Sequence, residues 1–184
     1  MSDPKSETLG ALAARALAEL APVFERLAPG AEDALVEAIV KAKRIAIYGA
    51  GREGLQMDGF AMRLFHMGRD VHVVGDMTTP PLGPGDLLII SAGPGASNIG
   101  DALIDVARQA GAEIAVVTAQ PKGRTAAKAG VLFHIPAQTM ADDHAAECKS
   151  HLAPDPVAEQ RPICPYLQGA WQPPVEHQVA ERNP

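Results

Sequence analysis

The chain has 184 residues, of which 47% are hydrophobic and 4% aromatic, and its formal net charge is −6 at pH 7. That length and apolar content suffice for one core built mainly from aliphatic side chains. The acidic balance argues against broad contact with nucleic acid or anionic membranes, so we expect neither as a partner. The N-terminal residues lack the features of a secretory signal, and no apolar run could span a bilayer, which predicts a cytoplasmic protein.

Two amphipathic helices are predicted before the first strand. Apolar residues recur at helical spacing over 6–27, after a cap at Ser6 or Thr8, and we expect Pro22 to kink or divide this helix. A second helix is predicted over 32–43. The apolar stripe of the first helix is wider than the surface of a monomer normally tolerates, so we expect a homodimer or homotetramer.

Five short apolar segments are predicted to be buried strands, at 44–48, 71–74, 87–90, 114–117 and 131–135. Helical patterns occur between strands, at 55–66 and 99–110. Helical segments between successive strands require parallel crossovers. We therefore expect an α/β fold with a five-stranded, doubly wound parallel sheet, a flavodoxin-like three-layer sandwich with two leading helices.

The chain changes character after Pro136, where prolines crowd a segment that also holds three histidines, the only tryptophan and both cysteines. We assign residues 1–140 to the α/β domain and 141–184 to a proline-rich C-terminal extension. Long regular helices are not expected in the extension. Its apolar residues are suited to docking on the same or a neighbouring subunit, and partial disorder is the alternative.

Two glycine-rich turns, each between a predicted strand and a helix, indicate a small-molecule site. They read GAGREG at 49–54 and SAGPGAS at 91–97. Such turns present backbone N–H groups to an anion at the carboxyl ends of parallel strands. The candidate binding residues are Gly49, Gly51, Arg52, Ser91, Gly93, Gly95 and Ser97.

The first turn also fits the dinucleotide fingerprint, with Asp76 about where a ribose-binding acid is expected. That hypothesis does not need the second glycine loop and leaves little chain for a substrate domain, so we do not favour it. Helix capping alone can explain Ser97, whereas Ser91 follows a central strand and opens toward the crevice where α/β sheets bind ligands.

Three stretches resemble the sugar isomerase (SIS) domain family, and within it the phospho-hexuloisomerases. Residues 47–54 resemble the family's GAGRSG turn, FAMRLFHMG at 60–68 its FAMRLMHLG helix, and GPGDLLIIS at 83–91 its GKGDLLIAIS approach to the phosphate loop. The resemblance implies an aldose–ketose isomerase that converts a sugar phosphate through an enediol, needs no cofactor, and has a site shared between subunits to which His66 is donated. The alternative for His66 is a structural histidine in a subunit interface.

The chain departs from the family pattern in both turns. Glu53 stands where the family has a serine, and SAGPGAS replaces the shorter, hydroxyl-richer SGSGET. A carboxylate there would repel a phosphate unless Arg52 or Lys122 compensates, and Pro94 removes one N–H donor. A non-catalytic module that binds a sugar derivative is therefore the alternative function.

The catalytic base is the least determined part of the site. The family's closing PMGS motif and its glutamate have only a loose counterpart at 165–172, where a glutamine replaces the carboxylate. The candidate catalytic residues are His66, Glu176, His177 and Glu53.

A second alternative is a metal-assisted enzyme that uses the extension. The spacing of His144, Cys148 and His151 would place them on one face of a helix, where they could hold zinc or another transition metal. They lack the paired-cysteine spacing of structural zinc sites, so we expect an ordinary polar segment there.

Overall fold

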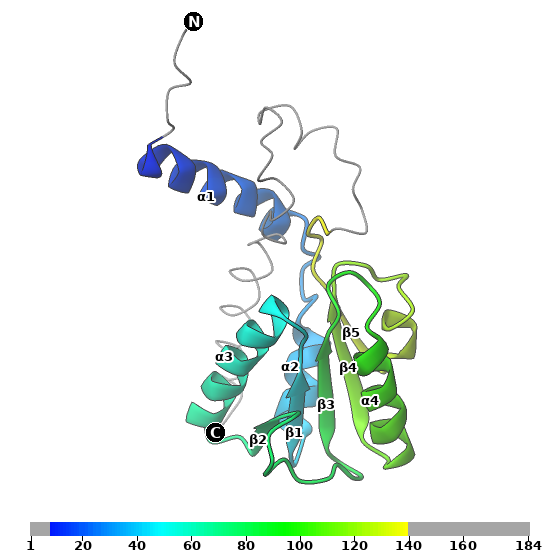
Figure 1. The fold of residues 1–184 in the computed structure, drawn as a ribbon. Coiled ribbons are helices and arrows are strands. Elements are labelled where there is room, and N and C mark those ends of the chain that lie inside the picture. Colours follow the sequence, from blue (N-terminus) through cyan, green and yellow to red (C-terminus); the bar gives the residue numbers. More distant parts are fainter. Residues whose placement is uncertain (1–7, 140–184) are drawn as a thin grey trace, which may run out of the picture.

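A computed structural model describes residues 8–139, in which five parallel strands form one sheet in the order β2-β1-β3-β4-β5 (Figure 1). The strands are β1 (Ile45–Tyr48), β2 (Val71–Val73), β3 (Leu87–Ser91), β4 (Glu113–Thr118) and β5 (Val131–His134). All five predicted strands and their parallel pairing are confirmed.

Helices cover both faces of the sheet, as predicted for a doubly wound sandwich (Figure 1). On one face, α2 (Asp33–Lys41) and α3 (Arg52–His66) bury Ile39 and Phe60 against the sheet. On the other face, α4 (Asn98–Gln109) buries Ile104. The strands alternate accordingly, so that Ile89 belongs to the first core cluster and Ile90 to the second.

Two of the four crossovers lack the α-helix that the sequence-based fold implied. The connection from β2 to β3, residues 74–86, is largely irregular, and that from β4 to β5 contains only the short 3₁₀ helix η1 (Ala126–Lys128). Pro80, Pro81 and Pro84 explain the first case, because proline lacks the N–H and fixes φ. Both connections still join parallel strands.

The helix boundaries differ from the prediction in two informative places. The first helix, α1 (Leu9–Glu25), is one continuous element that contains Pro22, so Pro22 does not divide it, which was one of the two effects expected of this proline. Thr8 caps it, accepting a hydrogen bond from the backbone N–H of Ala11 over 3.2 Å. Helix α3 begins at Arg52 rather than at residue 55, which places Glu53 in the first helical turn instead of a loop.

Helix α1 extends away from the sheet (Figure 1) and buries only Val23 among its residues. Its large apolar side chains are exposed, Leu9 by 83%, Leu12 by 40%, Leu17 by 69% and Phe24 by 38%. Exposed apolar side chains gathered on one helix are typical of surfaces that associate. The subunit interface expected at α1 therefore stays a prediction, and the exposed apolar side chains of this helix support it. No helix within residues 8–139 is long and apolar enough to cross a bilayer.

Replacing both Leu12 and Leu17 by glutamate should convert an oligomer into a smaller species, because two charges would have to enter an apolar interface. Light scattering at micromolar concentration measures the mass. Val106→Glu on α4 is the control, since Val106 is 66% exposed and should leave the mass unchanged. A native protein that is already monomeric would contradict this role for α1.

Candidate functional site

The two predicted glycine turns lie side by side at the carboxyl ends of β1 and β3. These strands are neighbours in the sheet, with Tyr48 paired to Ile90. The next strand in sequence lies outward from β1 in one direction and from β3 in the other, so the strand order reverses between them. Parallel α/β sheets bind their ligands at such a reversal. The fold thus places both turns where the sequence analysis expected a site.

The glycines of the first turn allow helix α3 to approach the end of β1 closely. A Cβ atom on Gly49 would lie 2.8 Å from Met57 Cγ, and one on Gly54 would lie 2.7 Å from the carbonyl oxygen of Gly49. Gly51 has a φ of +57°, in the region that side chains disfavour. These positions need glycine to close the turn, whether or not a ligand is present.

The central contact of the site joins the two turns through Glu53. The hydroxyl of Ser91 donates a hydrogen bond to Glu53 Oε2 over 2.6 Å. The backbone N–H of Gly93 donates to the same oxygen over 3.0 Å. A carboxylate therefore accepts hydrogen bonds from two donors of the loop that the sequence predicts to hold an anion.

Other donors of the 91–97 loop also have partners within the chain. The N–H of Gly95 donates to the carbonyl of Ala92 over 2.8 Å, and that of Ser97 donates to Thr125 Oγ1 over 2.9 Å. Pro94 has no N–H to offer. The N–H groups of Gly95 and Ser97 are therefore both bonded within the chain.

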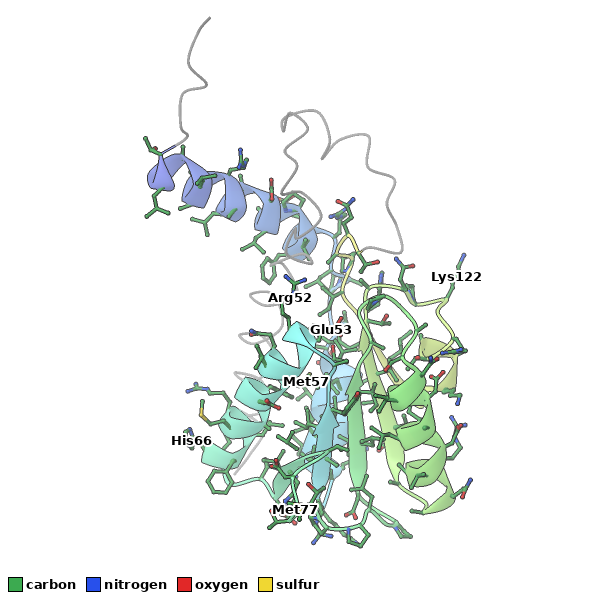
Figure 2. The ribbon with its side chains drawn as sticks, viewed as in Figure 1. Arg52, Glu53, Met57, His66, Met77 and Lys122 are labelled. Atoms are coloured by element: carbon green, nitrogen blue, oxygen red, sulfur yellow. The ribbon has the colours of Figure 1, made fainter. Side chains whose placement is uncertain are left out.

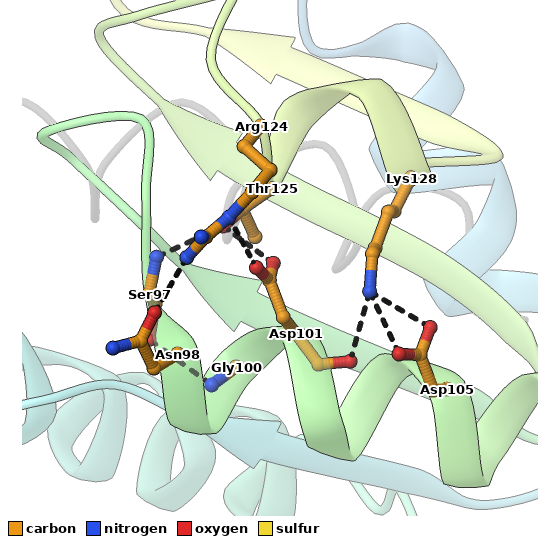
Figure 3. Close-up of polar contacts among 8 residues, drawn as sticks. All are labelled: Ser97, Asn98, Gly100, Asp101, Asp105, Arg124, Thr125 and Lys128. Atoms are coloured by element: carbon orange, nitrogen blue, oxygen red, sulfur yellow. Dashed lines mark hydrogen bonds and ion pairs between the residues drawn. The ribbon is translucent and has the colours of Figure 1, made fainter.

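A polar cluster on the first turns of α4 braces the loop from outside (Figure 3). The buried Thr125 hydroxyl donates to Asp101 Oδ1 over 2.8 Å while accepting from Ser97. Arg124 forms an ion pair with Asp101 Oδ2 over 2.7 Å and donates to Asn98 Oδ1 over 2.6 Å. Ser97 also caps α4, its Oγ accepting from the Gly100 N–H over 3.0 Å. Capping thus accounts for its side chain.

The segment that follows β4 packs directly on the loop. Thr118, at the end of β4, donates from its hydroxyl to the carbonyl of Ala92 over 2.7 Å. A Cβ atom on Gly95 would lie 2.6 Å from Gln120 Cβ, and Gly123 faces the backbone of Gly95 too closely for any side chain. Sequence reasoning missed this third segment. Thr118 could have been found, because it ends a strand at the same edge as Ser91.

The expected compensating cations do not pair with Glu53. Figure 2 shows Arg52 and Glu53 at the start of α3 and Lys122 on a separate loop. Within residues 8–139 no ion pair to Glu53 is found, and its described partners are Ser91 and Gly93. The carboxylate is thus stabilised by hydrogen bonds and by the N-terminus of α3, where negative charge is favoured.

Of the two candidate catalytic residues within 8–139, Glu53 lies in the crevice and His66 does not. His66 is exposed at the opposite end of α3 (Figure 2), about 20 Å from Glu53 along the axis at about 1.5 Å per residue. It can reach a crevice of this kind only from another subunit, as the resemblance implied.

Glu176 and His177 lie outside the described residues, as do the candidate metal ligands His144, Cys148 and His151. Residues 8–139 contain no group of three or more side chains placed to hold a metal ion. The division of the chain at residue 140 likewise falls at the limit of the described region and stays a prediction.

The model of the SIS domain family matches residues 38–154, which include both turns of the crevice. The chain belongs to the SIS domain family. It is 38% identical over 124 residues to the 3-hexulose-6-phosphate isomerase of Mycobacterium gastri, covering 67% of this chain and 62% of that one. It is also 38% identical over 107 residues to the Bacillus subtilis enzyme of the same name, covering 56% of each chain.

The SIS chain thus aligns with little more than half the length of these two curated relatives. Among solved structures, a Methanococcus jannaschii protein with an inferred 3-hexulose-6-phosphate isomerase function matches with a TM-score of 0.62 and 22% identity. The match covers 94% of this chain and 84% of that one. At that identity the likeness supports the fold alone.

Thr125→Val should lower the free energy of unfolding by about 1–3 kcal/mol, because it removes a buried hydroxyl and leaves the Ser97 N–H and an Asp101 oxygen without a partner. Urea denaturation measures the change. Thr78→Val, at an exposed position, is the matched control and should change little. Equal stabilities of the two variants would show that the brace does not hold the loop.

Proposed function

We propose that this SIS protein is an aldose–ketose isomerase of a phosphorylated sugar. The similarity to two 3-hexulose-6-phosphate isomerases is the observation that carries the proposal, and the SIS family match at residues 38–154 includes both crevice turns. The crevice supports it, because Ser91 and the N–H of Gly93 form a pair of donors at the reversal of strand order. Such donors suit a phosphate or a developing oxyanion.

The reaction removes a proton from the carbon next to the carbonyl and returns one to the neighbouring carbon, through an enediol. The protein must supply a base and must stabilise negative charge on the carbonyl oxygen. Glu53 is the candidate base that lies in the crevice of the same subunit, and His66 the one that a neighbouring subunit would donate. Glu176 and His177 complete the set of candidates.

A second function is favoured by one observation, the contact of Glu53 with the loop. If that contact persists with ligand, the protein binds a sugar derivative without converting it. The two functions differ in whether carbon-bound hydrogen exchanges with solvent.

The test is incubation of the protein with fructose 6-phosphate in D₂O, followed by NMR. An isomerase should incorporate deuterium at the carbon next to the carbonyl and form a second, isomeric sugar phosphate, because the abstracted proton exchanges with solvent. Ser91→Ala should lower the rate by about tenfold or more through loss of a donor in the crevice.

Thr78→Ala is the control for the Ser91 variant, since Thr78 is exposed on the connection between β2 and β3. It should leave the rate unchanged. Binding of the sugar phosphate without any deuterium incorporation would favour the binding module, and equal rates for the Ser91 variant and the native protein would place the site elsewhere.

A further inference from the structure

The loop that the sequence predicts to hold an anion already binds a negatively charged group from its own chain. We propose that the Glu53 carboxylate is an internal anion that competes with the phosphate of a ligand for Ser91 and Gly93, and so determines how strongly the site discriminates against phosphorylated sugars. This inference rests on the proposed function, because it assumes that the sugar binds in the crevice between the two turns.

The geometry of the contact leaves no room for both anions on the same donors. Glu53 Oε2 accepts the Ser91 hydroxyl over 2.6 Å and the Gly93 N–H over 3.0 Å. A hydroxyl and a backbone N–H each have a single hydrogen to donate. A phosphate oxygen that takes these two hydrogen bonds must therefore displace the carboxylate.

Displacement is costly for two reasons. Hydrogen bonds to a charged acceptor are stronger than those between neutral groups, so the ligand must replace two strong contacts. In addition, none of the residues 8–139 forms an ion pair with Glu53, so no cation of this part of the chain cancels its charge when a phosphate dianion approaches. The remaining donors cannot offset this cost where they are already bonded, as at Gly95 and Ser97.

The position of Glu53 makes displacement possible without unfolding. Its side chain is partly exposed, and it extends from the first turn of α3. Rotation about its side-chain bonds would release the loop while leaving the helix and the strand in place. The hydroxyl groups of a sugar carry no charge, so the Glu53 carboxylate does not repel them. The carboxylate therefore weakens binding of the phosphate group and not of the sugar itself.

Calorimetric titration with fructose 6-phosphate, and separately with fructose, tests the competition. Glu53→Gln keeps the shape of the side chain and removes the charge, whereas Glu53→Ser also vacates the loop. We expect fructose 6-phosphate to bind at least about tenfold more tightly to Glu53→Gln than to the native protein, and more tightly still to Glu53→Ser. Fructose should show no comparable gain.

Asp58→Asn is the matched control, since Asp58 is an exposed carboxylate on the same helix and its loss changes the net charge equally. It should leave both affinities within about twofold of the native values, because exposed charges are screened by solvent and salt. An equal gain for the Asp58 and Glu53 variants would reduce the effect to net charge and overturn the proposal.

Unchanged or weaker binding of fructose 6-phosphate by both Glu53 variants would also overturn it. Binding and turnover are measured separately, so native protein without any deuterium exchange would refute the isomerase, while tighter binding by the Glu53 variants would still support the competition. A crystal of the native protein soaked in fructose 6-phosphate gives a second measurement that needs no variant. Phosphate within hydrogen-bond distance of Ser91 Oγ and Glu53 turned away support the proposal, and phosphate bound with the Glu53–Ser91 contact intact overturns it.

Discussion

Pairing of β1 with β3 is the constraint on which the rest of the site depends. The two strands are separated by about forty residues of sequence, yet their register places Tyr48 beside Ile90. Whatever follows each strand must therefore emerge at the same edge of the sheet. Helix α3 and the 91–97 loop meet because their strands end together, and the contact between Glu53 and Ser91 is a consequence of that register.

The arrangement of this edge of the sheet then depends on the acceptors that its backbone N–H and hydroxyl donors find. A loop rich in small residues presents several donors that must find acceptors, from a ligand, from water or from the protein. Here the acceptors are a carboxylate for Ser91 and Gly93, and a threonine hydroxyl for Ser97. These donors already have acceptors within the chain, so a ligand that takes their hydrogen bonds must displace those acceptors.

The sequence was sufficient for the elements and insufficient for the contacts. Alternating glycine turns and aliphatic runs predicted five parallel strands, because buried strands such as β3 have little freedom to be anything else. The predicted start of α3 was three residues too late, because glycine at position 51 is compatible both with a loop that continues and with a loop that ends there. Because of this shift, Glu53 lies in the first turn of α3, a position that helix propensities alone do not predict.

The packing of the 118–125 segment on the loop was missed for a different reason. Its roles depend on distances between residues remote in the chain, such as Thr125 with Ser97, and no local pattern marks them. Predictions about residues 141–184 rested on composition alone, which indicates the kinds of contact a segment can make and not where the segment lies.

The close approach of Gly95 and Gly123 has a consequence for changing this protein's ligand preference by loop transplantation. A hydroxyl-rich loop taken from a relative would place side chains where the two backbones now touch. Because the two segments pack against each other, a graft of 91–97 alone should fold poorly. A graft that also includes 118–125 transfers the loop together with the segment on which it packs.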